Sequence, residues 1–248
     1  MDDKLLIESL RERFKIEWEA HDRGGIYAFT QKQIAYNSNK IEGSTLTREH
    51  TASLFETGSI LGVKDEVYRA KDVEEMTGHF AMFNEVLKTW DEPLSGDLIK
   101  KYHHCLKAGV FEDMANGYPI GEYKNRPNIA GDMHTAAPED VSRLIDELFN
   151  DYNKKTNIRV YDIACLHESY ERIHPFQDGN GRTGRIIVFK ECLKNNLIPV
   201  IIQNDHKEQY IRALKLAHEG KIESLADFFM AEQKDYAKEL LYFFPEHA

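Results

Sequence analysis

The 248-residue chain has few cysteines, no excess of positive charge and no long apolar run, and each shortage excludes a class of protein. Its three cysteines, Cys105, Cys165 and Cys192, are odd in number and scattered, which argues against a disulfide framework or a C-x-x-C metal site and favours reduced thiols. The net charge of −10 argues against broad nucleic-acid binding, which needs a basic surface. The charged N-terminal segment suits neither a signal peptide nor a membrane span, so we expect a cytoplasmic protein without a membrane partner.

What the sequence does have is apolar residues at intervals of three and four along most of its length, which predicts an all-α protein. No repeat and no linker rich in Pro, Gly or Ser divides it. We therefore expect one compact unit, with an N-terminal helical region at 1–64 and a core at 65–248. Val67 is assigned to the buried face of a long helix, and Thr47 is a candidate N-cap. Helices are expected near 5–18, 30–42, 46–58, 65–90, 95–108, 138–153, 158–173, 180–195, 205–219 and 222–243.

Two stretches need separate treatment. Residues 121–140 are rich in Gly, Pro and Asn and lack a helical period, and Gly131-Asp132 suits a tight turn, so a short β-hairpin or flap is predicted there. The aromatic tail at 227–244 favours core packing, with the seam of a homo-oligomer as the alternative.

The segment RIHPFQDGNGRTGRI, residues 172–186, carries the densest chemistry in the chain. Pro175 discourages helical geometry just before it, so a helix is expected to end at the histidine. Residues 178–181 read Asp-Gly-Asn-Gly, a turn whose glycines let backbone amides form an anion-binding nest. The turn leads into a new apolar run, so its amides lie at a helix N-terminus, which favours phosphate. Phe176 is expected to point into the core and fix the loop.

The charged side chains of this segment fit a nucleotide. Arg182 and Arg185 can fork onto phosphate oxygens. Asp178 offers a hard oxygen ligand for Mg²⁺, which usually accompanies nucleotide phosphates. His174 suits a general base. A helix–loop–helix connector with solvated side chains is the alternative for any two of these residues, and the full set in this order favours phosphate chemistry.

The stretch HPFQDGNGRTGR matches the H-x-F-x-[D/E]-G-N-G-R-x-x-R signature of Fic-domain proteins at every specified position. The resemblance runs from about residue 65 to 230. It implies the Fic fold, a helical bundle around the motif loop. It also implies an enzyme that transfers AMP from ATP to a hydroxyl of a protein target and releases pyrophosphate.

The resemblance also implies roles for the motif residues. His174 would deprotonate a Ser, Thr or Tyr hydroxyl, and Asp178 would hold Mg²⁺ between the α- and β-phosphates. Doc-type kinases of this fold carry a bulkier basic residue near Gly181, so the glycine favours AMP transfer over phosphorylation. The implied phosphate-binding residues are Gly179, Asn180 (near the α-phosphate), Gly181, Arg182 (β-phosphate) and Arg185 (γ-phosphate).

Upstream, SNKIEG places Ser38 and Glu42 four residues apart, on one face of a helix at about 30–43. It resembles the [S/T]-x-x-x-E-[G/N] inhibitory motif of the family, in the class with an N-terminal inhibitory helix. By this resemblance Glu42 would pair with Arg185 and take the place of the γ-phosphate. Two alternatives stay open: Glu42 positions water for AMP removal, or the site senses ATP without turnover.

The flap would dock the target, which adds to it as a β-strand through Ile129, Ala130, Gly131 and Met133. Ile129 and Met133 would clamp a target side chain. The target is unknown and includes the chain itself, with Ser38 as one candidate acceptor.

The adenine pocket is expected in residues 200–220. Tyr210 is a candidate wall for the base, with ordinary packing as an equal alternative. His218 stands where several relatives carry asparagine, which leaves the details of base recognition open. His167 is interpreted as a core histidine, and the pair at 103–104 is given no function.

Overall fold

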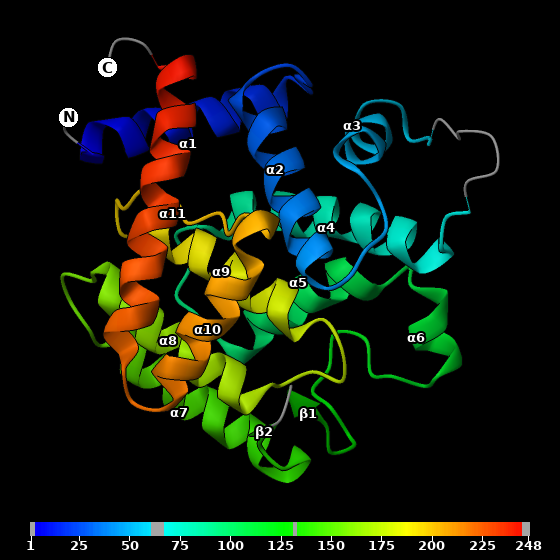
Figure 1. Cartoon of the computed structure of the whole chain (residues 1–248), viewed down its shortest axis with the longest axis vertical. Coiled ribbons are helices and arrows are strands. Elements are labelled where there is room, and N and C mark those ends of the chain that lie inside the picture. Colours follow the sequence, from blue (N-terminus) through cyan, green and yellow to red (C-terminus); the bar gives the residue numbers. More distant parts are fainter. Residues whose placement is uncertain (1–2, 61–66, 131–132, 245–248) are drawn as a thin grey trace.

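The computed structural model describes residues 3–60, 67–130 and 133–244, and these are almost entirely helical (Figure 1). None of the described helices is long and apolar enough to cross a membrane. Besides the α-helices, the described residues form two 3₁₀ turns, η1 (Pro138–Asp140) and η2 (Asn204–His206). They also form two short strands, β1 (Ile129–Ala130) and β2 (Met133–His134). The α-helices are α1 (Asp3–Glu19), α2 (Ile26–Ile41), α3 (Arg48–Thr57), α4 (Ala70–Thr89), α5 (Gly96–Lys107), α6 (Phe111–Ala115), α7 (Val141–Asn153), α8 (Val160–Ile173), α9 (Asn180–Lys194), α10 (Lys207–His218) and α11 (Ile222–Phe243).

Helix α9 is the centre of the packing. Nearly every residue from Asn180 to Leu193 is buried, which is the pattern of a helix enclosed on all sides. Helices α2, α4, α5 and α8 contact it directly. Because α9 begins at Asn180, inside the segment 172–186, the loop before it is attached to the most enclosed element of the fold.

The N-terminal helices share an apolar core with the later ones. The ring of Phe14 on α1 lies edge-on to that of Phe83 on α4, with 6.1 Å between their centroids. The centroid of Phe83 lies 5.5 Å from that of Phe189 on α9. Helix α11 crosses α1 in Figure 1. The guanidinium of Arg13 on α1 lies over the ring of Phe244, which directly follows α11. The division at residue 64 stays a prediction, since both predicted parts contribute to this core.

Several helix boundaries differ from the predicted ones. Helix α2 begins at Ile26, after Gly25 in extended conformation, rather than at residue 30. Helix α4 begins only at Ala70, so the assignment of Val67 to a buried helix face is wrong, and its side chain is 90% exposed. Helix α6 was not predicted, because five residues are too short to show a period. The N-cap role of Thr47 is confirmed, since its hydroxyl accepts from the His50 N–H.

In the predicted hairpin region, β1 and β2 pair antiparallel, with Ile129 opposite His134 and Ala130 opposite Met133. Pairing is thus confined to two residues on each strand among the described part of 121–140. Gly131 and Asp132 lie outside the described residues.

The aromatic tail packs inward. Phe229, Leu240 and Phe244 are buried, and Phe228 and Phe243 are partly buried against the same clusters. Core packing therefore accounts for most of its aromatic side chains, while the oligomeric state stays a prediction.

Candidate active site

His174 caps the C-terminus of α8 in the left-handed region, with φ 53° and its N–H donating to the Tyr170 carbonyl at 2.9 Å. This reversal turns the chain out of the helix and exposes part of the imidazole to a cavity of about 840 Å³. Burial, assisted by the charge of Lys124, lowers the pKa of His174 to about 4. The imidazole is therefore neutral near pH 7 and able to accept a proton.

The loop after His174 is held by side chains that bond its backbone. Asn180 Oδ1 accepts from the Phe176 N–H at 2.7 Å, and Asn180 Nδ2 donates to the Phe176 carbonyl at 2.7 Å. Phe176 is fully buried, as predicted. Asn180 lines the cavity, but these two bonds engage its side chain, so it positions the loop and its backbone faces the ligand space.

His103 on α5, for which no function was expected, supports the same loop. Its ring stacks on that of Phe176, with 4.0 Å between the ring centroids and 5° between the ring planes. The Gly121 N–H donates to its Nδ1 at 2.9 Å, so Nε2 carries the proton and donates to the Asp178 carbonyl at 3.0 Å. Burial lowers the pKa of His103 to about 3, which keeps the ring neutral in this role.

The N-terminus of α9 faces the cavity. Gly179 takes φ 83° as the N-cap, and Gly181 follows it on the cavity wall. The first N–H groups of a helix have no partner within the helix, so this end is suited to an anion. The predicted phosphate-binding loop thus opens into the large cavity.

The two arginines of the loop have different partners. Arg182 is buried and pairs with Glu75 of α4, with Asp178 at 3.5 Å and with Asn39 Oδ1 at 3.3 Å. Arg185 points instead to the end of α2, which is described below. Both guanidiniums remain charged, since their carboxylate partners raise their pKa against the effect of burial.

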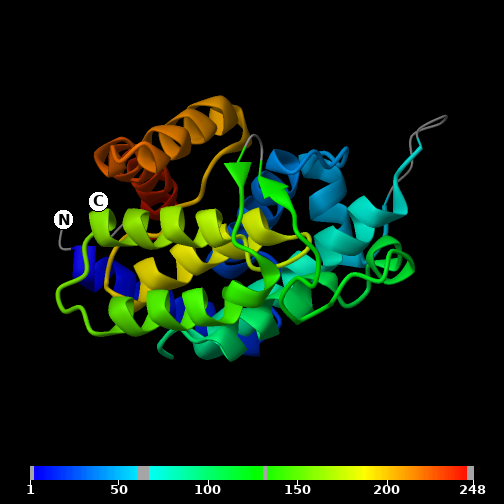
Figure 2. The same cartoon turned by 90° about the horizontal axis from the view of Figure 1, so that it is seen from below.

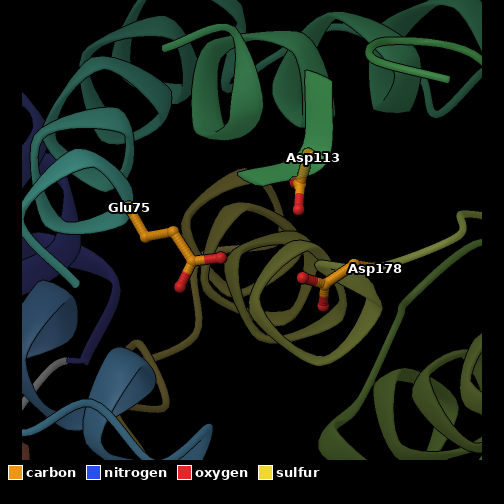
Figure 3. Close-up of side chains that lie close together, drawn as sticks. All are labelled: Glu75, Asp113 and Asp178. Atoms are coloured by element: carbon orange, nitrogen blue, oxygen red, sulfur yellow. The ribbon is translucent and has the colours of Figure 1, made fainter. Parts of the chain in front are cut away.

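Asp178 belongs to a cluster of three carboxylates, with Glu75 and Asp113, whose oxygens converge within 4.8 Å (Figure 3). The ammonium of Lys107, from α5, pairs with all three, at 2.6 Å to Glu75, 2.6 Å to Asp113 and 2.9 Å to Asp178. A buried lysine therefore already supplies the cation that this cluster needs.

Asp178 is the member of the cluster that reaches a ligand space. Its side chain is 33% exposed and borders both the large cavity and a second one of about 550 Å³. Burial alone would raise its pKa, but Arg182 and Lys107 outweigh that and hold the pKa well below its usual range. One ionised carboxylate beside a phosphate-binding loop fits Mg²⁺, which takes one or two protein carboxylates and completes its shell with phosphates and water.

The end of α2 closes over the loop. Arg185 donates to Glu42 Oε1 at 2.7 Å, to Ser38 Oγ at 3.0 Å and to the Ser38 carbonyl at 2.9 Å. The predicted pairing of Glu42 with Arg185 is thus present. Burial disfavours the Glu42 carboxylate, but Arg185 and Arg182 outweigh that effect and lower its pKa. A side chain at Gly181 would overlap the Glu42 carboxylate, so the glycine makes this close approach possible.

The opposite wall of the cavity is built by α10. Tyr210 is buried and its hydroxyl bonds His167 Nε2 at 2.8 Å, so His167 is the core histidine that was predicted. His218 bonds Glu168 through Nδ1 at 2.8 Å. Tyr210 and His218 both line the cavity, which is compatible with the predicted base pocket and also with simple packing of Tyr210.

The segments that flank β1 and β2 (Figure 2) are tied to the loop through the buried Lys124. Lys124 Nζ donates to Asn128 Oδ1 at 2.8 Å and to Thr135 Oγ1 at 2.7 Å, and its N–H donates to the Pro175 carbonyl at 2.8 Å. Burial lowers the pKa of Lys124 to about 8. Between these anchors Ile129 is 66% exposed and lines the cavity.

The residues that support the loop from other parts of the chain carry no sequence signal. They are far from the loop along the chain, and a single buried lysine, histidine or glutamate forms no motif. The missed residues are Glu75, His103, Lys107, Lys124 and Glu171.

The fold is that of known Fic structures. The chain is similar to a Fic-domain-containing signalling protein from Bacteroides thetaiotaomicron, with TM-score 0.71 and 23% identity over 93% of this chain and 94% of that one. It is also similar to a segment of Fic-1 from C. elegans, with TM-score 0.72 and 18% identity over 100% of this chain and 74% of that one. The architecture is therefore the all-helical Fic fold.

Sequence comparison points to the same family. Residues 93–191 match the model of the Fic/DOC family. The chain is 27% identical over 199 residues to the protein adenylyltransferase Fic of Aedes aegypti and 26% identical over 233 residues to that of Drosophila melanogaster. These matches cover 79% and 91% of this chain but only 39% and 46% of those proteins. The chain is thus a distant homologue of those Fic proteins and spans less than half of their length.

Proposed function

We propose that the chain is a Mg²⁺-dependent protein adenylyltransferase that transfers AMP from ATP to a Ser, Thr or Tyr hydroxyl of a protein target. One observation carries the proposal: a single cavity is bordered by the neutral imidazole of His174, the ionised Asp178, the guanidinium of Arg185 and the N-terminus of α9. A proton acceptor beside groups that bind phosphate is what transfer to a hydroxyl requires. The names of the distant homologues support the same reaction.

In this reaction the imidazole of His174 takes the proton of the target hydroxyl as its oxygen bonds the α-phosphorus. The bond from the α-phosphorus to the oxygen that bridges to the β-phosphate breaks, and pyrophosphate leaves. Arg185 and the first amides of α9 hold the phosphates in line for attack. Asp178 would hold Mg²⁺, which neutralises phosphate charge when bound.

Glu42 is proposed to inhibit this reaction. Its carboxylate occupies Arg185, and a γ-phosphate competing for the same guanidinium would be displaced. A nucleotide bound in that way has its α-phosphate out of line, and small misplacements cost about 100-fold in rate.

Intact mass after incubation with Mg²⁺-ATP tests the proposal. The samples are the wild-type chain, Glu42→Gly, and Glu42→Gly combined with His174→Ala, each with and without a lysate as a source of targets. An AMP mass is expected in the single variant and no addition in the double variant. An added phosphate mass, or AMP addition that persists without His174, contradicts the assignment.

AMP removal is the second candidate. The ionised Glu42 borders the cavity and is 36% exposed, so it is placed to orient a water there. In that reaction Glu42→Gly would lose activity toward an AMP-modified substrate instead of gaining transfer. A pre-modified target offered to both proteins separates the two directions.

Two roles remain proposals within the same site. A target segment would extend the hairpin beside the exposed Ile129, and self-modification uses the same route. The adenine would lie between Tyr210 and His218, where Ile211 and Leu214 add apolar wall.

A further inference from the structure

Glu171 is a buried carboxyl beside the base that neither the motif nor the comparisons assign. It lies one helical turn before His174 on α8, and its side chain is 9% exposed. The absence of a side chain at Gly184 makes room for it, because a Cβ there would overlap Glu171 Oε1. The carboxyl is thus fixed between two helices and also borders the large cavity.

The two groups that face one another here lack ordinary hydrogen bonds. Glu171 Oε2 lies 3.8 Å from His174 Nδ1. Among the described residues, His174 Nδ1 and Glu171 Oε1 are buried atoms without a hydrogen-bond partner. A buried polar atom left in this way costs free energy, so a rotation that shortens the gap is favoured. Catalytic hydrogen bonds are often long before substrate binds and tighten in the complex.

We propose that Glu171 is a positioning residue: its carboxylate accepts a hydrogen bond from Nδ1–H of His174 and thereby leaves the Nε2 lone pair facing the cavity. The inference rests on the proposed function, in which Nε2 takes the target's proton. If the carboxyl carries the proton instead, it donates to Nδ1 and the ring hydrogen moves to Nε2, where no lone pair remains. The protonation of Glu171 thus selects the tautomer of His174.

The surroundings of Glu171 place the titration of its carboxyl near neutral pH. Burial raises the pKa of Glu171 to about 7, against the opposing charge of Arg185 and with a smaller raising effect of Glu42. Beside His174, Lys124 lowers the pKa of the imidazole, while the backbone of Glu171 and the charges of Glu42 and Asp178 raise it. The groups that face Glu171 are His167, Tyr170 and His174 of its own helix, Arg185 of α9, Glu42 at the end of α2 and Tyr210 of α10.

Ring ¹⁵N NMR of histidine-labelled full-length protein between pH 5 and 8 tests the proposal without reference to activity. In the wild type and in Glu42→Gly, His174 is expected to change from the Nε2–H to the Nδ1–H tautomer as pH rises through about 7. In Glu171→Gln the tautomer ratio should not change with pH over this range. A His174 tautomer that is independent of pH in the wild type overturns the proposal, and that measurement needs no variant to fold.

The rate of AMP transfer gives the second readout, in the Glu42→Gly background. The rate should rise with pH through about 7, and Glu171→Gln should remove that rise and lower the plateau about ten-fold. Glu232→Gln is the matched control, because Glu232 is also buried with a raised pKa but lies on α11 beside His206. An unchanged pH profile in Glu171→Gln overturns the proposal. If Glu42→Gly transfers nothing, the adenylyltransferase assignment fails while the NMR result still decides the role of Glu171.

Discussion

The two arginines of the phosphate loop lie one helical turn apart, yet their surroundings differ in kind. Arg182 is surrounded by carboxylates from the core, Glu75 on α4 and the neighbouring Asp178, with Lys107 sharing both of them. Arg185 is held by the end of α2, through Ser38 and a carboxylate that keeps 36% of its surface exposed. The charged partners of Arg182 belong to the folded scaffold, although Asn39 of α2 also bonds it. The partners of Arg185 lie together at the end of α2 and can be withdrawn by moving that end.

The contacts of Arg182 therefore bear on the stability of the fold, and those of Arg185 on the regulation of the site. When a buried network loses one charge, the remaining charges are left unpaired in a low-dielectric interior. Removing such a charge therefore lowers the free energy of unfolding strongly. The Glu42 carboxylate is 36% exposed and can exchange its partner for water at a smaller cost, although burial still disfavours its charge. We therefore expect Arg182 and its partners to control whether the loop is formed, and Arg185 and Glu42 to control whether it is available.

The largest effect is expected from Glu75→Gln, which keeps the shape of the side chain and removes its charge. Arg182 and Lys107 would then share the two remaining carboxylates, and we expect the free energy of unfolding to fall by about 3 kcal/mol. Urea unfolding measures it. Glu42→Gln is the matched control on the other side of the loop, with an expected loss of about 1 kcal/mol or less. Equal losses in the two variants would remove the distinction between the arginines.

Glu42→Gly comes next, with AMP transfer raised about 100-fold as Arg185 is released to the γ-phosphate. Initial rates at saturating Mg²⁺-ATP measure the change. Glu56→Gly, which removes an exposed carboxylate that pairs with Lys32 on α2, is the control and should leave the rate unchanged. An unaltered rate in Glu42→Gly would show that the Glu42 carboxylate does not restrain transfer, and the proposed difference between the two arginines would lose its regulatory side.

Lowering the pH is expected to destabilise the scaffold, because its buried histidines are neutral in the folded state. Burial lowers the pKa of His79, His103 and His167 to about 3, from 6.5 in the unfolded chain. Between these values the unfolded state binds protons that the folded state does not, so stability is lost as pH falls below about 6.5. The loss at pH 5 is about 2 kcal/mol for each histidine.

Urea midpoints at pH 7.5 and pH 5 check this pH dependence. Glu171 titrates in the opposite sense, because its raised pKa favours the folded state at low pH and offsets part of the loss. Glu42→Gly should show the same decrease as the wild type. Equal midpoints at the two pH values would contradict a scaffold built on neutral histidines.

The smallest effect is expected from Ser38→Ala, which removes the hydroxyl that accepts from Arg185 Nε. One hydrogen bond to a charged group is worth about 1 kcal/mol or slightly more, so transfer should rise about five-fold. Ser38→Thr retains the hydroxyl and should keep the wild-type rate. A larger rise in Ser38→Ala than in Glu42→Gly would make the serine, rather than the carboxylate, the main restraint on Arg185.

The loop at 174–181 and the helical architecture could be predicted from the sequence because both depend on neighbours along the chain, while phosphate binding by the loop stays a prediction. His174, Asp178 and Arg185 fall within twelve positions, and the pairing of Glu42 with Arg185 followed from a second short motif. The role of Asn180 was predicted incompletely, since its side chain bonds the Phe176 backbone four residues away, a contact that depends on the shape of the loop.

Residues from other helices could not be predicted in the same way. Lys107 reaches Asp178 across 71 positions, and His103 reaches the same residue across 75. Local periodicity marks such positions as buried but does not say which loop they will meet. Val67 shows the opposite error, an apolar residue counted into a helix that begins three residues later.

A Cβ at position 181 would overlap the end of the Glu42 side chain, which is flexible and can move aside. A side chain there would therefore push the carboxylate away from Arg185 while leaving the glutamate itself in the chain. In this respect a mutation at 181 is expected to resemble a mutation of Glu42, although the two positions are 139 residues apart.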